Sequence, residues 1–483
     1  MTESNNDTTR IEDECSINIQ ADPSCLQQFF NCTVHIHQHC GGCGNCDSND
    51  SPCTCQTTDE PTECQHECTC GTESCDPKTD TPTPTPAPPI SIELPIDASQ
   101  RSYYVSIARD SKDRIICGGQ NQQAGVIDRY STDLSMVDRV QLTGFRPGQT
   151  LVCCDEQDRI YAVAASGGTT TPEDYLVRLG DDMQLQAQCS LHDNSAYTAT
   201  AHTIHYVDNH ILVAGQITLG ADTPEQLYLL RLTTDFELVA SCYFKVDSHP
   251  GQHSDIGLAT ASDGKIYLAH NASQVGIHIA QLDSNLNIEH ETMLDTELLP
   301  HSATVASDGQ LLICGKQFVA RASADLSQVR YWAINPIIQP LEFRDIAQAS
   351  DGSLYLGGVM QHSGANHFDG AIIKLNPAMQ VLSGWQLHNP EDKTSLIEAC
   401  TISNANQFWC AGWTDSRPVL MNESYLSQPD SNWDISSIST LSFSEMTPGT
   451  RAPNRIDIAE PPIQLMDSQW PWQHSLHPAE NSN

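Results

Sequence analysis

The chain has 483 residues, with 23 basic and 61 acidic side chains and a formal net charge of −38. So much negative charge repels nucleic acid and favours cationic or calcium-bearing surroundings. The sequence has no run of about 18 apolar residues, and its polar, acidic start does not fit a secretory signal peptide. We therefore expect no nucleic-acid partner and no membrane-spanning segment. The chain is long enough for one large and one small domain.

The cysteines gather near the N-terminus, where 12 of the 20 lie within residues 1–80 and large apolar side chains are few. Core burial cannot stabilise such a segment, so crosslinks or metal ions must do so. We predict a small, loop-rich base domain over residues 1–78, held by disulfides or by a zinc or iron ion. The candidate metal-ligating residues here are Cys40, Cys43, Cys46, Cys64, His66, Cys68 and Cys70. The candidate disulfide cysteines are Cys15, Cys25, Cys32, Cys53, Cys55 and Cys75.

The segment Cys32–Cys40 (CTVHIHQHC) alternates in a way that predicts a strand with His35, His37 and His39 on one face. A His-X-His strand resembles the metal site of trimeric bacteriophage tail fibres and spikes, where three chains each give two histidines to one axial ion. The resemblance implies that His35 and His37, or His37 and His39, are ligands and that residues 1–80 form a trimer. The alternative is an exposed polar strand face.

A run of proline and threonine follows over residues 79–89 (TDTPTPTPAPP). This composition favours an extended polyproline II conformation, which spans about 3.1 Å per residue. We predict a spacer between the base and the rest of the chain.

Residues 90–430 repeat one pattern, a hairpin turn followed by an apolar strand that ends in glycine, as in Ala349–Gly358 (ASDGSLYLGG). Asp-Gly or Asn-X between two apolar runs supplies the positive φ of a tight hairpin turn. The turn residues are Asp113, Asp158, Asn209, Gly264, Gly309, Gly352 and Asn406. Their spacings of 45, 51, 55, 45, 43 and 54 residues fit one four-stranded propeller blade per copy. We predict an all-β fold, a seven-bladed β-propeller.

The sixth copy also contains Asp369–Pro377 (DGAIIKLNP), and together these segments resemble the SBBP-type bacterial β-propeller repeat. The resemblance implies the fold alone, because propellers host many functions. The last copy shows only three strands, so we expect Ile90–Ile96 to supply its outer strand and close the ring. The alternative donor is the region Trp433–Phe443.

Several polar residues stand where the innermost strands enter the ring. We expect Tyr104, His202, His253, His301, Arg344 and Glu398 near the axis. Such a set suits an anionic sugar or a metal ion, and the alternative is a merely polar, water-filled channel. The sequence has no Ser-His-Asp pattern, paired carboxylates at a defined spacing or phosphate loop. We therefore do not expect an enzyme.

Two features remain after the repeats are assigned. Cys400 and Cys410 lie on neighbouring strands of one hairpin and are candidates for a disulfide. Residues 431–483 are polar and rich in proline and serine, which predicts an extended tail. We expect Trp470 and Trp472 to pack this tail against the ring or a neighbour.

A stapled base, a stiff spacer and a displayed ring form the layout of an attachment protein. We expect a trimeric, non-enzymatic virion or tail component that contacts other virion or surface proteins and binds a host glycan or surface protein. A virion protein is released by lysis, so it needs no signal peptide. The alternatives are an exported cellular surface adhesion protein and a propeller enzyme that acts on polysaccharide.

Overall fold

The computed structural model describes residues 91–93 and 102–446, apart from gaps of one to ten residues, together with 449–451, 464–466 and 474–478. The chain separates into two units, Met1–Thr81 and Pro82–Asn483, and every described residue lies in the second. The base domain and spacer predicted for residues 1–89 lie outside the described residues, as do Trp470 and Trp472.

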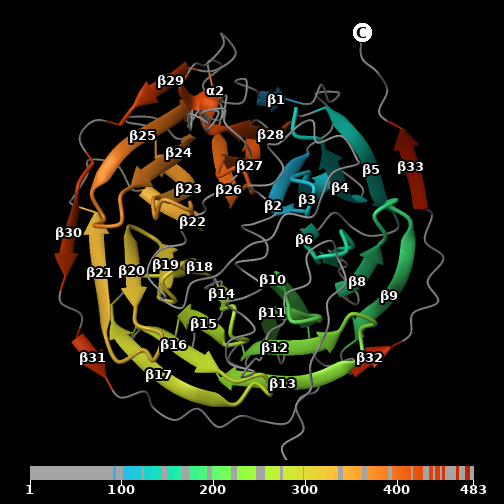
Figure 1. Ribbon diagram of the computed structural model, residues 1–483, viewed down its shortest axis with the longest axis horizontal. Helices are drawn as coiled ribbons and strands as arrows, with labels where there is room; N and C mark the ends of the chain where they lie inside the picture. The colour runs from blue at the N-terminus through green and yellow to red at the C-terminus, as the bar shows by residue number, and fades with distance from the viewer. Residues whose placement is uncertain are drawn as a thin grey trace, which may run out of the picture. The chain divides into compact units, whose positions relative to one another are not determined.

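Seven antiparallel sheets surround a common axis, and this confirms the predicted seven-bladed β-propeller (Figure 1). Blades 1 and 2 consist of β2 (Tyr103–Arg109), β3 (Ile115–Asn121), β4 (Ala124–Tyr130) and β5 (Met136–Thr143), then β6 (Thr150–Cys154), β7 (Ile160–Ala165), β8 (Asp174–Leu179) and β9 (Leu185–His192). Blades 3 and 4 consist of β10 (Thr198–Val207), β11 (His210–Thr218), β12 (Gln226–Thr233) and β13 (Leu238–Lys245), then β14 (Ile256–Thr260), β15 (Ile266–Asn271), β16 (Ile277–Leu282) and β17 (Ile288–Asp295). Blades 5 and 6 consist of β18 (Pro300–Val305), β19 (Leu311–Gly315), β20 (Phe318–Ala322) and β21 (Val329–Ile334), then β22 (Leu341–Gln348), β23 (Leu354–Gln361), β24 (Phe368–Leu375) and β25 (Val381–His388).

Blade 7 closes the ring with a strand from the other end of the repeat region. Its own strands are β26 (Ser395–Ile402), β27 (Phe408–Thr414) and β28 (Arg417–Asn422), and β1 (Ser91–Glu93) pairs with β28. Ile92 lies opposite Leu420 in this antiparallel pair. The prediction that Ile90–Ile96 supplies the closing strand is therefore confirmed. A short helix, α2 (Glu423–Ser427), follows β28, and no described helix has the length and apolar character to cross a bilayer.

The first hairpin of every blade, and the third hairpin of five blades, turn through residues with positive φ. The seven predicted turn residues, from Asp113 to Asn406, have φ between 58° and 81°. The turn between the third and fourth strands instead uses a buried apolar residue at positive φ in five blades. These residues are Met183, Phe236, Leu286, Leu326 and Met379. Their side chains are buried, so packing compensates a conformation that costs about 1–2 kcal/mol.

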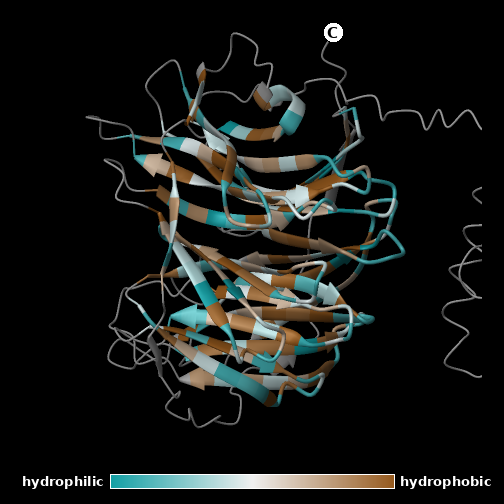
Figure 2. Cartoon of the chain, turned by 60° about the vertical axis from the view of Figure 1, so that its left-hand side comes forward, coloured by the Kyte–Doolittle hydropathy of each residue, from teal (hydrophilic) through white to brown (hydrophobic). Residues whose placement is uncertain are grey.

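The hydrophobic core is divided among the blade interfaces. Seven clusters of buried side chains each draw on two neighbouring blades, so every interface in the ring has one. The cluster between blades 7 and 1 contains Trp409 from β27 and Tyr104 from β2. Figure 2 shows the same distribution, with hydrophobic residues along the strands of the stacked sheets. A blade buries both faces only because it has a neighbour on each side.

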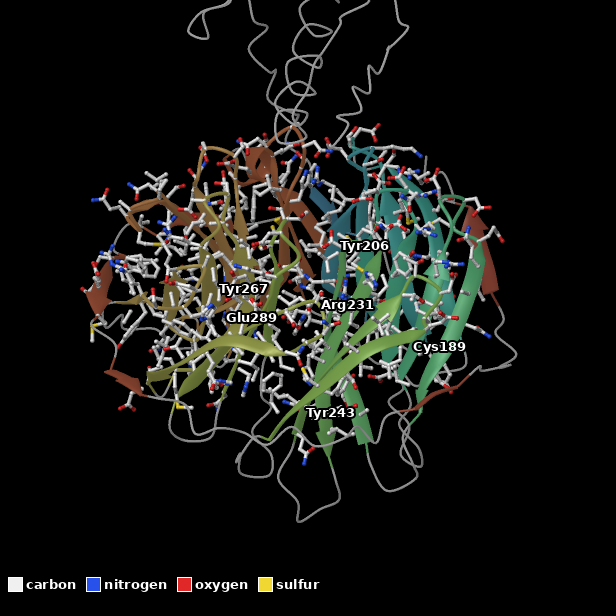
Figure 3. The ribbon with its side chains drawn as sticks, turned by 60° about the horizontal axis from the view of Figure 1, so that its bottom comes forward. Cys189, Tyr206, Arg231, Tyr243, Tyr267 and Glu289 are labelled. Carbon is white, nitrogen blue, oxygen red and sulfur yellow. The ribbon has the colours of Figure 1, made fainter. Side chains whose placement is uncertain are left out.

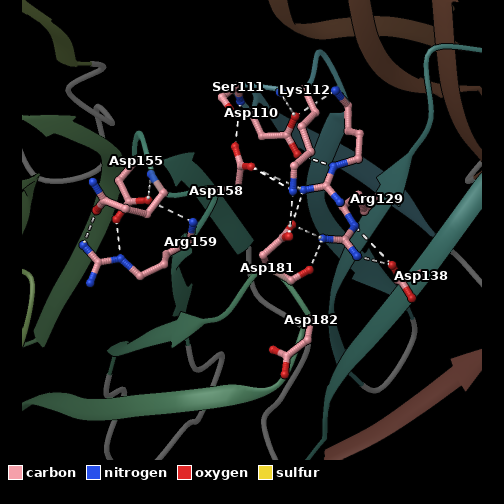
Figure 4. Close-up of polar contacts among 12 residues, drawn as sticks. Asp110, Ser111, Lys112, Arg129, Asp138, Asp155, Asp158, Arg159, Asp181 and Asp182 are labelled. Carbon is pink, nitrogen blue, oxygen red and sulfur yellow. Dashed lines mark hydrogen bonds and ion pairs between the residues drawn. The ribbon is translucent and has the colours of Figure 1, made fainter. Parts of the chain in front are cut away.

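Polar side chains near the end of the third strand also join neighbouring blades. In four blades this side chain is an arginine that donates to a backbone carbonyl in the next blade's outer turn. The pairs are Arg129 with Asp181 (2.5 Å), Arg178 with Thr234 (2.6 Å), Arg231 with Ser284 and Arg321 with Pro377 (3.3 Å). Figure 4 shows Arg129 held between Asp138 of its own blade and Asp181 of the next. In blade 6, Lys374 Nζ instead lies 2.8 Å from Glu423 Oε1 in α2.

The tail after α2 continues around the ring and adds a fifth strand to most blades. These strands are β29 (Asp434–Ser437), β30 (Phe443–Met446), β31 (Gly449–Arg451), β32 (Gln464–Met466) and β33 (His474–Pro478). They pair with blades 6, 5, 4, 2 and 1 in that order, antiparallel to the outermost strand each time (Figure 1). Among the described residues, blade 3 has four strands only. We call these five strands the belt. The strands described within the alternative donor region, β29 and the start of β30, belong to the belt rather than to blade 7.

The candidate disulfide between Cys400 and Cys410 is not formed in the structure. The two residues lie directly opposite each other on β26 and β27, but both thiols are free. Side chains of adjacent strands stand side by side, perpendicular to the sheet, and need not point at each other. Both thiols instead pack in the apolar cluster between blades 6 and 7.

Candidate functional site

A cavity of about 520 Å³ lies where the innermost strands of all seven blades converge. Strands β2, β6, β10, β14, β18, β22 and β26 all contribute to its wall. Figure 3 shows that Tyr206, on innermost strand β10, lies nearer the ring centre than Cys189 on outermost strand β9. A volume of this size is within the range of about 300–1,000 Å³ found for small-molecule sites.

Four of the six predicted axial residues line this cavity: His202, His301, Arg344 and Glu398. Each is the extra residue of a β-bulge, a place where one residue of the innermost strand has no partner on the second strand. A bulge redirects the side chain of its extra residue. The fold therefore aims these four side chains toward the axis by one repeated backbone feature. His253 lies outside the described residues.

The prediction for Tyr104 is wrong by one residue. The bulge of β2 falls between Tyr104 and Ser106, so Val105 is the residue that lines the cavity. Tyr104 is 1% exposed and its hydroxyl group donates to the fully buried carboxylate of Asp128. Burial and this carboxylate raise the pKa of Tyr104 well above its usual value.

The glycine that ends each of these repeat copies is what permits the bulge. A Cβ atom at any of five such positions would lie 1.9–2.2 Å from a backbone carbonyl oxygen at the start of the bulge. The glycines are Gly119, Gly215, Gly315, Gly358 and Gly412. At Gly358, for example, the carbonyl oxygen of Glu342 would be 2.1 Å away. No other residue fits such an approach, so the repeat's most visible glycine serves the cavity.

Charged and aromatic side chains gather at the end of the cavity where the innermost strands begin. Glu342 Oε1 lies 2.6 Å from Arg344 Nη2 and 3.3 Å from His301 Nε2. The Trp413 indole donates to Glu398 Oε1 at 3.3 Å. We call these five residues the polar cluster. Glu342 and Trp413 are not among the predicted residues, although Glu342 stands two positions before Arg344 on one strand.

The two glutamates of the polar cluster have pKa values that move in opposite directions. The hydrogen bond from His301, with help from Arg344, lowers the pKa of Glu342. Burial raises the pKa of Glu398, and Arg344 and Trp413 only partly oppose this effect. Near neutral pH the Glu342 carboxylate is therefore held more firmly in its charged form than that of Glu398.

A third carboxylate lies deeper in the wall. Asp345 accepts hydrogen bonds from Ser302 Oγ at 2.6 Å, from the Cys400 amide at 2.7 Å and from the Ile346 amide at 2.8 Å. Burial nevertheless raises the pKa of Asp345 to about 6. The three donors position this carboxyl group between blades 5, 6 and 7.

Asp345 should make stability depend on pH. Its pKa is raised on folding, so its favourable contribution is complete below its ordinary pKa, near 3.8, and is lost as pH rises through about 6. Between about pH 4.5 and pH 7.5 the parent chain should lose about 2 kcal/mol relative to Asp345→Asn, which does not titrate. Urea unfolding of both proteins at the two pH values measures this difference. A difference that does not change with pH would contradict the assignment.

The sequence matches no protein-family model and no curated protein. Among solved structures, the chain is similar to a protein of unknown function from Bacteroides caccae, with 12% identity, a TM-score of 0.38 and coverage of 54% of this chain and 89% of that chain. It is also similar to YCF48 bound to D1 peptide, with 10% identity, a TM-score of 0.38 and coverage of 69% and 94%. A protein from Lactobacillus plantarum shows 14% identity, a TM-score of 0.36 and coverage of 58% and 82%. These similarities add nothing on function to the seven-bladed ring described above.

Proposed function

We propose that the protein is a non-enzymatic attachment protein whose propeller binds a glycan at the polar cluster. The observation that carries the proposal is the repeated bulge, which directs His202, His301, Arg344 and Glu398 into one cavity. A fold that needed only a filled axis would have no use for charged side chains there. Their convergence on one cavity is the arrangement expected of a binding site.

The chemistry of the polar cluster suits sugar hydroxyl groups. Arg344 donates hydrogen bonds, Glu342 accepts them, and a hydroxyl group does both. Trp413 lies beside them, and its ring centroid is 6.3 Å from that of Tyr103. Aromatic faces next to carboxylate and guanidinium groups provide apolar and polar contacts for the two sides of a sugar ring.

The proposal is tested by binding of the purified full chain to an array of bacterial and host glycans. Arg344→Ala and Glu398→Gln should weaken binding of any positive glycan at least tenfold, because the first removes a cationic donor that faces the cavity and the second replaces a carboxylate there by a neutral amide. The matched control is Arg330→Ala, since Arg330 lies on blade 5 away from the cavity and pairs with Glu445 of the belt. Equal binding by all three variants would contradict the proposal.

A polysaccharide-active enzyme is the second candidate, favoured by the opposite pKa shifts of Glu342 and Glu398. Carboxyl groups whose environments separate their pKa values can divide the roles of general acid and general base. Release of reducing ends from a bound glycan, lost in Glu398→Gln while binding persists, would favour the enzyme. Binding without turnover by the parent chain would favour attachment.

We further propose that this attachment protein is part of a virion or tail, and that residues 1–80 form its trimer. This proposal rests on the resemblance of the His35–His39 segment to trimeric tail-fibre metal sites. The resemblance of the ring to the SBBP-type repeat adds no function. A full chain that remains monomeric under non-reducing, metal-replete conditions would count against the trimeric virion assignment and favour a cellular surface protein.

A further inference from the structure

Two histidines and a carboxylate converge on blade 6, outside the axial cavity. His367 immediately precedes β24, Asp369 lies within it, and His388 ends β25. One ligand atom from each residue lies within 4.8 Å of the others. Asp369 is fully buried, whereas the His367 and His388 side chains are 15% and 17% exposed. The group therefore combines a shielded anion with two imidazoles that solvent reaches.

Both histidines approach the same carboxylate oxygen. His388 Nδ1 lies 3.0 Å from Asp369 Oδ1, and His367 Nε2 lies 3.9 Å from that atom. In a tetrahedral zinc site with bonds of about 2.1 Å, neighbouring ligand atoms are about 3.4 Å apart. The two measured distances lie on either side of this value. Small side-chain rotations would therefore place all three atoms around one ion.

The surroundings of Asp369 match those of a metal-bound carboxylate. Gln386 Nε2 donates to the other oxygen, Asp369 Oδ2, at 2.5 Å. Such an outer hydrogen bond orients a ligating carboxylate, and here it leaves Asp369 Oδ1 available for the ion. A buried anion also gains most from a divalent cation, because little water is present to screen the attraction.

We propose that His367, Asp369 and His388 bind a zinc-type divalent cation, with the fourth position taken by solvent or an exogenous ligand. Two imidazole nitrogens and one carboxylate oxygen favour zinc and other late first-row metals over calcium or magnesium, which prefer oxygen ligands alone. The site is separate from the polar cluster, so it stands or falls independently of glycan binding.

A group of two buried histidines in blade 4 shows the contrast. In blade 4, His270 Nε2 lies 3.0 Å from His278 Nδ1, and His278 Nε2 lies 3.1 Å from Glu291 Oε2. His270 Nδ1 is in turn 3.1 Å from the carbonyl oxygen of Asn271. These nitrogens form a linear chain of hydrogen bonds rather than converging on one point. We therefore assign this group to blade packing.

Zinc content of the full chain tests the proposal, measured by mass spectrometry after chelator treatment and equilibrium dialysis against buffered Zn²⁺. Residues 1–80 supply further cysteines and histidines, so the informative quantity is the difference between variants. His367→Ala and His388→Ala should each bind one zinc ion fewer per chain than the parent. His290→Ala, which removes an exposed histidine of β17, should bind the same number.

A second variant tests the outer hydrogen bond. Gln386→Ala should keep the stoichiometry at saturation but weaken the affinity of this one site about 10–100-fold. If His388→Ala does not fold, His367→Ala still decides, because its nitrogen lies farther from Asp369 and its loss disturbs blade 6 less. Zinc content equal to the parent in a folded His367→Ala chain would overturn the proposal.

Discussion

Replacing Gly358 by alanine should lower the free energy of unfolding by about 3 kcal/mol or more, although it adds only one methyl group. The new Cβ would lie 2.1 Å from the Glu342 carbonyl oxygen and 2.8 Å from the Phe343 Cα. Backbone atoms cannot move aside as a flexible side chain can, so the bulge between β22 and β23 must distort. Urea unfolding of the parent and variant chains measures the loss.

The same substitution should also disturb the site. The bulge presents Arg344 to the cavity, so a folded Gly358→Ala chain should lose the glycan binding proposed above together with stability. Gly370→Ala is the matched control in the same blade, because its Cβ would be 3.4 Å from the nearest side-chain atoms, an ordinary contact. This control should change stability by less than about 1 kcal/mol. Equal effects at both glycines would show that the close approach at Gly358 is not limiting.

Ending the chain after Ser427 should be still more damaging, with a loss of at least about 5 kcal/mol. The truncation removes the belt and with it several apolar contacts. Leu441 is 7% exposed, and the Phe443 ring stacks on Phe343 at 6.2 Å between centroids. Ile435 and Ile438 pack against the clusters of blades 6 and 7 and of blades 5 and 6. Calorimetry should show a lower melting temperature.

The truncated chain should also aggregate, because five outermost strands lose their hydrogen-bonded partners and become open sheet edges. Light scattering during storage at constant temperature measures this. The control is a chain ending after Pro478, which keeps β33 and the whole belt. Its light scattering should rise no faster than that of the parent chain. A truncated chain as stable and as soluble as this control would show that the belt contributes nothing to the ring.

The sequence predicts the ring well because a hairpin turn is a local event. A tight turn requires positive φ at Asp113 or Gly352, whatever the blade packs against. The closing strand is also predictable, since a three-stranded last repeat must find a fourth strand somewhere. Two expectations that depend on longer-range geometry are not met. Tyr104 is displaced by a one-residue bulge, and Cys400 and Cys410 are adjacent without being bonded.

The belt and the group of His367, Asp369 and His388 are much harder to predict from the sequence than the ring is. Belt strands of three to five residues have no repeat of their own, and their spacing is set by the circumference of the ring. His367 and His388 are separated by 21 positions, and only the pairing of β24 with β25 brings His388 to Asp369. Glu342 likewise becomes part of the polar cluster only through its contact with His301, which lies on the preceding blade. Such groups depend on tertiary structure, which no local pattern encodes.

The order of the belt along the chain has a consequence for biosynthesis. Every blade precedes the belt in the sequence, so the ribosome finishes the entire ring before any of the five belt strands has been made. The belt strands then pair with the blades from blade 6 back to blade 1, which is the reverse of the order in which the blades were translated. The blades translated first therefore keep an unpaired outer edge for the longest time. In a nascent chain, these N-terminal blades are the most exposed to non-native strand pairing.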